Sequence, residues 1–197
     1  MAPPDPAGAP GKPWWQRLLD ALIDQSVTPA GGVGGHVWIG GTGYDAAKER
    51  TMDAAKLDAL CLQLVAAPDL QPAPDGRTFC NFAIQRAAAA YGCRDLDHLM
   101  ANDMAAQLPA LPGWRQVGGA RAAMHALAGG LAIAAKAYPA HGHVAVVAPR
   151  ACEYSGSWGR SVPVVANVGR QNGFMKCSQA FPVAEGEPLY FAYGETA

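Results

Sequence analysis

A cysteine opens a helical pattern in the segment TFCNFAIQRAAAAYG, residues 78–92. Thr78 is a typical N-cap residue, which would put Cys80 in the first turn of the helix. Unpaired backbone N–H groups and the positive end of the helix dipole favour an anion there, so a thiol at this position is expected to have a pKa below its usual value of about 8.5. Free cysteine is also among the most often buried residue types. Cys80 is therefore either a nucleophile or a small core residue.

A nucleophilic cysteine needs a base, which is usually a histidine. His125 lies inside a predicted helix, His98 lies near a helix start, and His36 borders a glycine-rich stretch. In AHGHVAVVAP, residues 140–149, His141 and His143 stand at the entrance of a strand, and alternation directs both to one face. One imidazole that faces the N-terminal end of the helix from a strand would complete a Cys–His pair. A histidine at a strand end is, however, more often a surface residue.

An asparagine interrupts the next apolar strand pattern, VPVVANVG, residues 162–169. An amide is costly to bury unless it is hydrogen-bonded, and orienting a histidine ring would satisfy Asn167. Alternatively, Asn167 begins a turn into GRQNG, and both readings remain open. The chain order Cys80, His143, Asn167 is that of papain-type enzymes.

The composition indicates a globular protein with one core. The chain has 197 residues, half of them hydrophobic, and 15 Lys and Arg residues against 16 Asp and Glu residues, so it has no net field that would attract nucleic acid or an anionic membrane. There is no apolar run of transmembrane length and no secretory signal pattern, so we expect a protein made in the cytoplasm that leaves by another route. Its five cysteines form no CxxC pair, and we expect at least one free thiol, no metal site and no cofactor.

Two composition changes divide the chain into three parts. Residues 1–12 are rich in Pro, Ala and Gly, which predicts a disordered tail. Residues 13–76 form an N-terminal extension, with helices predicted over 13–25 and 44–67 around a Gly-rich stretch and with Cys61 on the inward face of the second helix. The proline-rich segment PDLQPAPDG, residues 68–76, marks its end. Residues 77–197 form the remaining domain.

Within that domain, helical patterns come first and strand patterns follow. The helices are predicted over residues 78–91, 98–108 and 120–130. The strands are predicted over residues 131–138, 142–149, 162–169 and 188–194. This order predicts an α+β fold with an antiparallel sheet.

Several of these segments resemble one family. TFCNFAIQRAAAAYG, MANDMAAQL, the following Trp114, GHVAVVAP and VPVVANVGRQNG are similar, in order and spacing, to the NlpC-type papain-like peptidoglycan peptidases, above all the amidase effectors of type VI secretion systems and related phage cell-wall hydrolases. The resemblance covers roughly residues 77–182. It implies a papain-like fold, in which an N-terminal catalytic helix packs on a small antiparallel β-sheet.

The resemblance also implies roles for four residues. Cys80 matches the nucleophile and His143 the general base, because the GHV frame selects His143 over His141. Asn167 is a candidate for the group that orients the histidine, which varies in this family. Asn102 lies in a segment that is near the cleft in similar proteins, and is therefore a candidate substrate contact.

The function implied by the resemblance is cleavage of an amide bond in the peptide stem of peptidoglycan, between D-glutamate and the diamino acid, through a thioester. An enzyme of this kind acts in the periplasm or cell wall of a target cell after delivery by a secretion system or by phage lysis. An immunity protein that plugs the cleft is then an expected partner.

Two other classes of function compete with this one. The stretch Gly41-x-Gly43-x-x-Ala46 loosely fits a dinucleotide-binding fingerprint, but a proline-rich segment stands where the second parallel strand should begin. The second rival is a non-catalytic wall-binding or virion structural module that has the same fold. The presence of both Cys80 and His143 speaks against that module.

Overall fold

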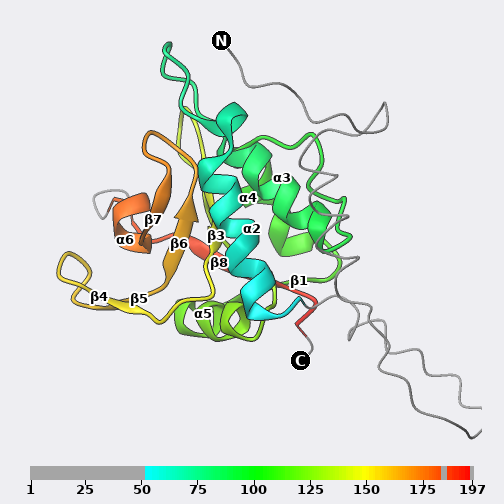
Figure 1. Ribbon diagram of the computed structural model, residues 1–197, viewed down its shortest axis with the longest axis vertical. Coiled ribbons are helices and arrows are strands. Elements are labelled where there is room, and N and C mark those ends of the chain that lie inside the picture. Colours follow the sequence, from blue (N-terminus) through cyan, green and yellow to red (C-terminus); the bar gives the residue numbers. More distant parts are fainter. Residues whose placement is uncertain (1–51, 183–185, 196–197) are drawn as a thin grey trace, which may run out of the picture. The chain divides into compact units, whose positions relative to one another are not determined.

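The computed structural model describes residues 52–182 and 186–195, which fold around a six-stranded sheet (Figure 1). The strands follow the order β1-β8-β2-β3-β6-β7, and every neighbouring pair is antiparallel. Their bounds are β1 Trp114–Val117, β2 Ala132–Lys136, β3 His143–Val147, β6 Val164–Asn167, β7 Gly173–Lys176 and β8 Leu189–Tyr193. β4 Glu153–Ser155 and β5 Arg160–Val162 form a separate hairpin. The predicted α+β class with an antiparallel sheet is confirmed.

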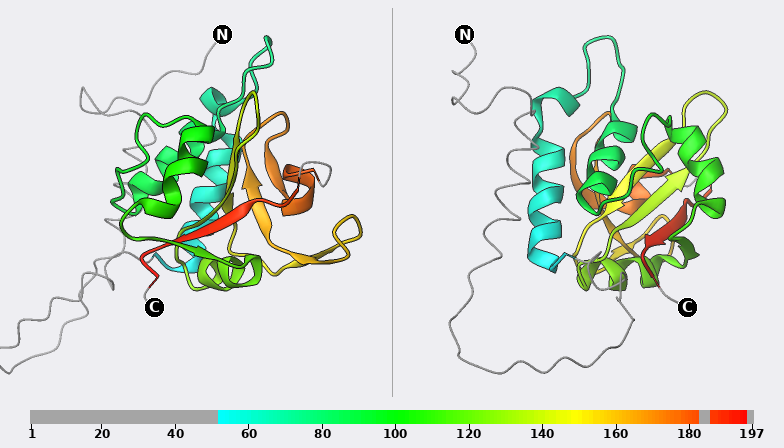
Figure 2. Two further views of the ribbon diagram at one scale, coloured as in Figure 1. Left: turned by 180° about the vertical axis from the view of Figure 1, so that it is seen from behind. Right: turned by 90° about the vertical axis from the view of Figure 1, so that its right-hand side faces the viewer.

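Helices cover this sheet and bury its central strands. They are α2 Ala54–Ala66, α3 Cys80–Ala90, α4 Ala101–Gln107, α5 Gly119–Leu127 and α6 Cys177–Ala180, with the short 3-10 turns η2 Pro68–Leu70 and η3 Leu108–Ala110. α3 packs on β3, α4 on β2 and β3, and α5 on β8 and β2. In Figure 1, α2 and α3 lie in front of the sheet, and the view from behind in Figure 2 shows β8 in front of α2. The apolar residues of β2 and β3 are consequently buried.

α2 belongs to the same packed body as the sheet, although sequence reasoning assigns it to an N-terminal extension. Its inward stripe, which includes Cys61 as predicted, packs against β6 and β7. Arg150 pairs with Asp58 of α2 at 3.2 Å and lies over the ring of Phe174, 3.4 Å from its centroid. The proline-rich segment 68–76 is therefore the connection between two helices of one core.

Several elements differ from the sequence predictions. α3 begins at Cys80, with Phe79 rather than Thr78 at the N-cap. β1 lies between α4 and α5 and pairs with the C-terminal strand β8, so the helices do not all precede the strands. The patterns did not predict β1, β4, β5 or β7, which have only three or four residues each and too few positions to show alternation. The predicted tail 1–12, the helix 13–25, His36 and the Gly41–Ala46 motif lie outside the described residues.

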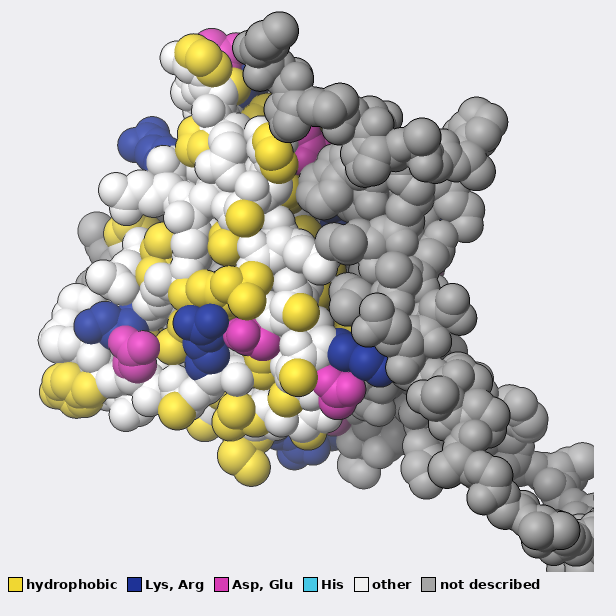
Figure 3. Space-filling view, in the orientation of Figure 1, with side chains coloured by type: hydrophobic (Ala, Val, Ile, Leu, Met, Phe, Trp, Pro, Cys, Tyr) yellow, Lys and Arg dark blue, Asp and Glu magenta, His cyan; other side chains and the backbone are white. Residues whose placement is uncertain are grey.

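The described residues contain no candidate membrane-spanning helix, and the face drawn in Figure 3 shows no large patch of one charge. In residues 52–182 and 186–195, no helix is both long and apolar enough to cross a bilayer. On the face drawn in Figure 3, basic and acidic side chains are interspersed among apolar ones. That mixture agrees with the near-zero net charge of the chain.

Candidate active site

Three chain segments meet near the upper end of the molecule in Figure 1: the start of α3, the start of β3 and the end of β6. β3 and β6 pair with Val146 opposite Ala166, so continuing the register puts Asn167 opposite Ala145. Side chains two residues apart on a strand share a face, which makes His143 a diagonal neighbour of Asn167. Strand register therefore brings together two of the predicted site residues.

A chain of hydrogen bonds fixes the imidazole of His143. Its Nε2 lies 2.7 Å from Oδ1 of Asn167, and Nδ2 of Asn167 donates to the carbonyl of Gln171 at 2.6 Å. Because the Gln171 carbonyl can only accept, it holds the amide with Oδ1 toward the ring. Nε2 of a neutral ring must then carry the hydrogen. Nδ1 is left as the nitrogen that can accept a proton.

Apolar packing surrounds the same ring. Phe181, which is fully buried, lies with its ring centroid 4.9 Å from that of His143. A Cβ at Gly169 would come within 3.3 Å of Cε1 of His143, so the glycine gives the ring room. Burial lowers the pKa of His143 below 6.5, and the bond to Asn167 opposes part of that shift. The imidazole is therefore a neutral base near pH 7.

Cys80 is the first residue of α3, and its thiol contacts the backbone amides of Val144 and Asn81. Val144 directly follows His143, so this contact brings the thiol to the strand that carries the imidazole. Cys80 is only 5% exposed, because α3 buries Ala83 and Ile84 against the sheet. Burial raises the pKa of Cys80 above 9.0, and the backbone amides offset part of the rise. The expected low pKa is wrong, because desolvation outweighs the amides at the helix start.

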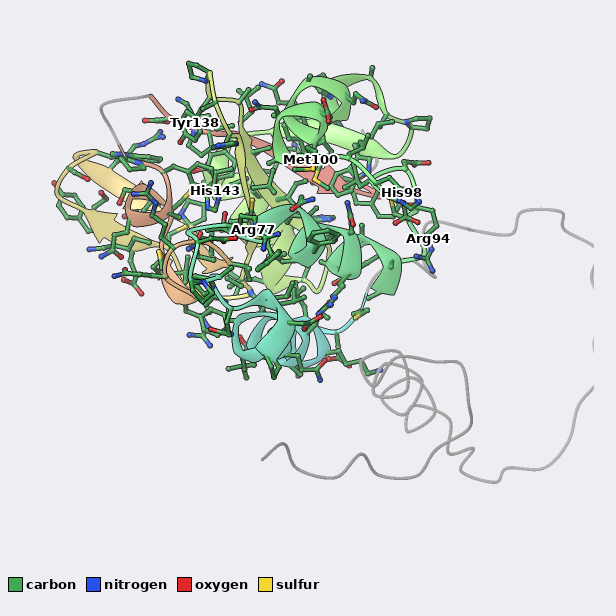
Figure 4. All side chains as sticks on the ribbon, turned by 90° about the horizontal axis from the view of Figure 1, so that it is seen from above. Arg77, Arg94, His98, Met100, Tyr138 and His143 are labelled. Carbon is green, nitrogen blue, oxygen red and sulfur yellow. The ribbon has the colours of Figure 1, made fainter. Side chains whose placement is uncertain are left out.

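The other described histidines lie elsewhere. His125 has Nε2 3.1 Å from the carbonyl oxygen of Tyr193, and His141 is exposed in the loop before β3. His98 has a positive φ of 64° in the turn before α4. In projection from above, Figure 4 shows His143 among Tyr138, Met100 and Arg77, with His98 toward the outer end. Of the candidate bases in the described residues, only His143 lies on the strand that the thiol of Cys80 contacts, one residue before Val144.

Asn102 closes the loop that leads into β3. Its Nδ2 donates to the carbonyl of Tyr138 at 3.0 Å, and its Oδ1 accepts from the N–H of Tyr138 at 3.1 Å. A Cβ at Gly142 would meet this Oδ1 at 2.5 Å, so the loop needs glycine there to approach so closely. The amide thus anchors the backbone just before His143. Contact with a substrate remains a prediction. Nδ2 of Asn102 has two hydrogens and donates one of them to Tyr138, so the second could bind a substrate oxygen.

Sequence reasoning missed three residues that hold the histidine: Phe181, Gln171 and Asn172. The last two lie in the turn between β6 and β7, where Asn172 bonds to Gly169 and to Leu70. A signal for this turn exists in the polar run RQN between Gly169 and Gly173, but its partners come from distant segments. Local sequence could therefore predict the turn but not its contacts.

The cysteines and the metal-ligating side chains of the described residues show neither a disulfide nor a metal cluster. All five cysteines are free thiols, and four of them are buried. Within the described ranges, no three His, Cys, Asp or Glu side chains converge as metal ligands would. A comparison of the chain with protein-family models finds no match, and a comparison with curated proteins finds none either.

Proposed function

We propose that this protein is a papain-like cysteine amidase in which Cys80 is the nucleophile, His143 the general base and Asn167 the orienting group. The observation that carries the proposal is the hydrogen-bonded chain from His143 through Asn167 to Gln171, together with a thiol at the start of a helix that contacts the backbone of Val144, the residue after His143. A nucleophile, a base and a group that orients the base are the three parts that covalent amide cleavage requires. The helix packed on an antiparallel sheet supports the papain-like fold.

The mechanism starts from two neutral groups, because burial keeps the proton on Cys80 and off His143. Nδ1 of His143 accepts the thiol proton as sulfur bonds to the amide carbonyl carbon. N–H groups at the start of α3 stabilise the oxyanion. The C–N bond then breaks, and His143 gives the proton to the leaving amine. Water, deprotonated by His143, attacks the thioester, which releases a carboxylic acid and restores the thiol.

The proposed substrate is the peptide stem of peptidoglycan, cut between D-glutamate and the diamino acid. This choice rests on the family resemblance of the segments around Cys80 and His143. The enzyme would then act in the periplasm of a target cell after delivery by a secretion system or phage lysis, and an immunity protein would protect the producing cell. Expression directed to the periplasm should stop growth, and Cys80→Ala should remove that toxicity.

The decisive experiment is digestion of purified muropeptides, with the products weighed by mass spectrometry. The wild type should release fragments that correspond to one amide bond, and Cys80→Ala should release none. Cys61→Ala is the matched control, because Cys61 is also a buried cysteine on a helix but lies on α2. Equal turnover by the wild type and Cys80→Ala would reject Cys80 as the nucleophile.

One observation favours the rival proposal of a non-catalytic module: Cys80 is 5% exposed. Iodoacetamide labelling of the native protein separates the two functions. In an amidase, the reagent should modify Cys80 without unfolding, because a substrate carbonyl must reach the same sulfur. A thiol that reacts only after denaturation, together with intact muropeptides, would support the wall-binding or virion module.

A further inference from the structure

The turn between β6 and β7 contacts both members of the histidine–asparagine pair. The carbonyl of Gln171 accepts the Nδ2 hydrogen of Asn167 at 2.6 Å. A Cβ at Gly169 would lie 3.2 Å from Nδ2 of Asn167 and 3.3 Å from Cε1 of His143. The conformation of this turn therefore decides both the room for the ring and the direction of the amide that the ring contacts.

Asn172 holds that turn in place with both ends of its amide. Its Oδ1 accepts from the N–H of Gly169 at 2.9 Å, which closes the turn on itself. Its Nδ2 donates to the carbonyl of Leu70 at 2.9 Å, 102 residues away in the chain. Leu70 is buried in η2, which packs against α2 and α3. Asn172 thus links the turn beside His143 to the segment that precedes Cys80.

We infer that Asn172 is a positioning residue for His143, acting through Gln171 and Asn167. The inference rests on the proposed function for its catalytic meaning. Asn172 contacts neither the imidazole nor the thiol through any hydrogen bond found in the described residues. Its effect is to keep the Gln171 carbonyl where it selects one orientation of the Asn167 amide.

The physical reason is that a primary amide keeps nearly the same shape when a rotation by 180° exchanges its oxygen and its NH₂ group. If the Gln171 carbonyl moves away, the Asn167 amide loses what distinguishes its two orientations. A rotated amide would present Nδ2 to Nε2 of His143, and Nε2 would then have to accept. The proton of the neutral ring would move to Nδ1, the nitrogen that must take the thiol proton. A turn that loosens by a few tenths of an ångström could therefore change which nitrogen is the base.

The test is Asn172→Ala, examined by ¹⁵N spectroscopy of labelled histidine, with the His143 signals assigned by their absence in His143→Gln. In the wild type, Nε2 should carry the proton. In Asn172→Ala, the His143 signals should shift toward a mixture of the two tautomers. Turnover should fall about 10²-fold at nearly unchanged KM, the scale of a misplaced catalytic group. Gln179→Ala is the control, because Gln179 also bonds to backbone, at the N–H of Lys176, but forms no hydrogen bond with the turn or with the His143–Asn167 pair in the described residues.

A second variant keeps the test decisive if Asn172→Ala does not fold. Asn172→Asp is isosteric and retains the acceptor for the Gly169 N–H but loses the donor to Leu70. An unchanged Nε2–H tautomer in the folded variants would overturn the inference. The tautomer needs no substrate, so its shift would uphold the positioning role even if muropeptides stayed intact, an outcome that would reject the proposed function alone.

Discussion

The two sides of the site are built by different means. On the Cys80 side, the thiol is held by the start of a helix, by backbone amides and by burial of α3 on β3. On the His143 side, the ring is held by two side-chain amides, which we call the relay. Asn167 contacts the ring directly, and Asn172 fixes the turn that follows β6. Backbone positions change little with side-chain identity, whereas the side-chain amides of Asn167 and Asn172 can each be removed by one substitution.

This difference makes the two sides differ in their tolerance of mutation. Substitutions near Cys80 act through packing, so they should alter stability and reactivity together. Substitutions in the relay should leave the fold intact while disturbing the base. The relay is thus the better place to separate catalysis from folding.

His143→Gln should have the largest effect on this comparison. Removal of the proposed base should lower turnover by about 10²- to 10⁴-fold, the usual contribution of general acid–base catalysis. The protein should stay folded and the surroundings of the Cys80 thiol should not change, because the thiol contacts backbone N–H groups. Muropeptide turnover and circular dichroism measure the two outcomes.

His125→Gln is the matched control for that variant. His125 also bonds through Nε2, to the carbonyl of Tyr193, but lies at the end of α5. Its replacement should leave turnover near that of the wild type. If both variants lost turnover equally, the loss would come from destabilisation, and the contrast between the two sides would fail.

Asn102→Ala should have a smaller effect, because Asn102 anchors the loop before His143 from α4 and does not orient the ring. Loss of its two bonds to Tyr138 should lower the free energy of unfolding by about 1–3 kcal/mol, the range for two ordinary hydrogen bonds. Urea unfolding measures this loss. The ¹⁵N signals of His143 should keep the Nε2–H tautomer, since Asn167 and Gln171 remain.

The outcome for turnover decides the predicted role of Asn102 in binding. A residue that only anchors the loop should leave KM unchanged, whereas a substrate contact should raise KM with little change in kcat. Asp103→Ala, on the same helix, is the control for a general loss of α4, because Asp103 bonds to the N-cap amide of Met100. Similar KM values for both variants and the wild type would exclude the substrate contact.

The sequence predicted the long elements and the strand-borne histidine, because their patterns are local. Helical spacing located α3, and short apolar runs bounded by Gly and Pro located β3 and β6 within a few residues. The pairing of His143 with Asn167 needed the register of β3 and β6, which the β4–β5 hairpin separates in the chain. The two interpretations of Asn167 do not exclude one another, because its amide contacts His143 through Oδ1 and bonds through Nδ2 to Gln171 in the turn that follows β6.

The electrostatics of the site could not be read from sequence in the same way. A cysteine at a helix start predicts a low pKa, but the sign of the shift depends on how deeply the helix end is buried. Leu70 and Asn172 show a second limit, because their bond joins residues 102 positions apart. Local sequence patterns contain no information about the burial of the helix end or about the bond between Leu70 and Asn172.

The smallest expected effect is on the pH dependence of stability. The His143 side should lower stability in acid, and the Cys80 side should lower it in alkali. His143 has a pKa below 6.5 in the folded protein, so the unfolded chain binds more protons as the pH falls below 6.5, and stability is lost there. Cys80 has a pKa above 9.0, so the unfolded chain releases its proton first as the pH rises past 9.0, and stability is lost there. Each group contributes at most about 1.4 kcal/mol per pH unit.

Urea unfolding of the wild type, His143→Gln and Cys80→Ala across this range tests the contrast. His143→Gln should show a shallower loss than the wild type in acid and the same loss in alkali, and Cys80→Ala should show the reverse. The comparison uses differences between variants, so the titration of other groups cancels. If His143→Gln instead lost more stability in acid, the imidazole would be charged in the folded protein. The neutral starting state of the mechanism would then be wrong, and loss of the alkaline difference in Cys80→Ala as well would indicate a thiolate–imidazolium pair.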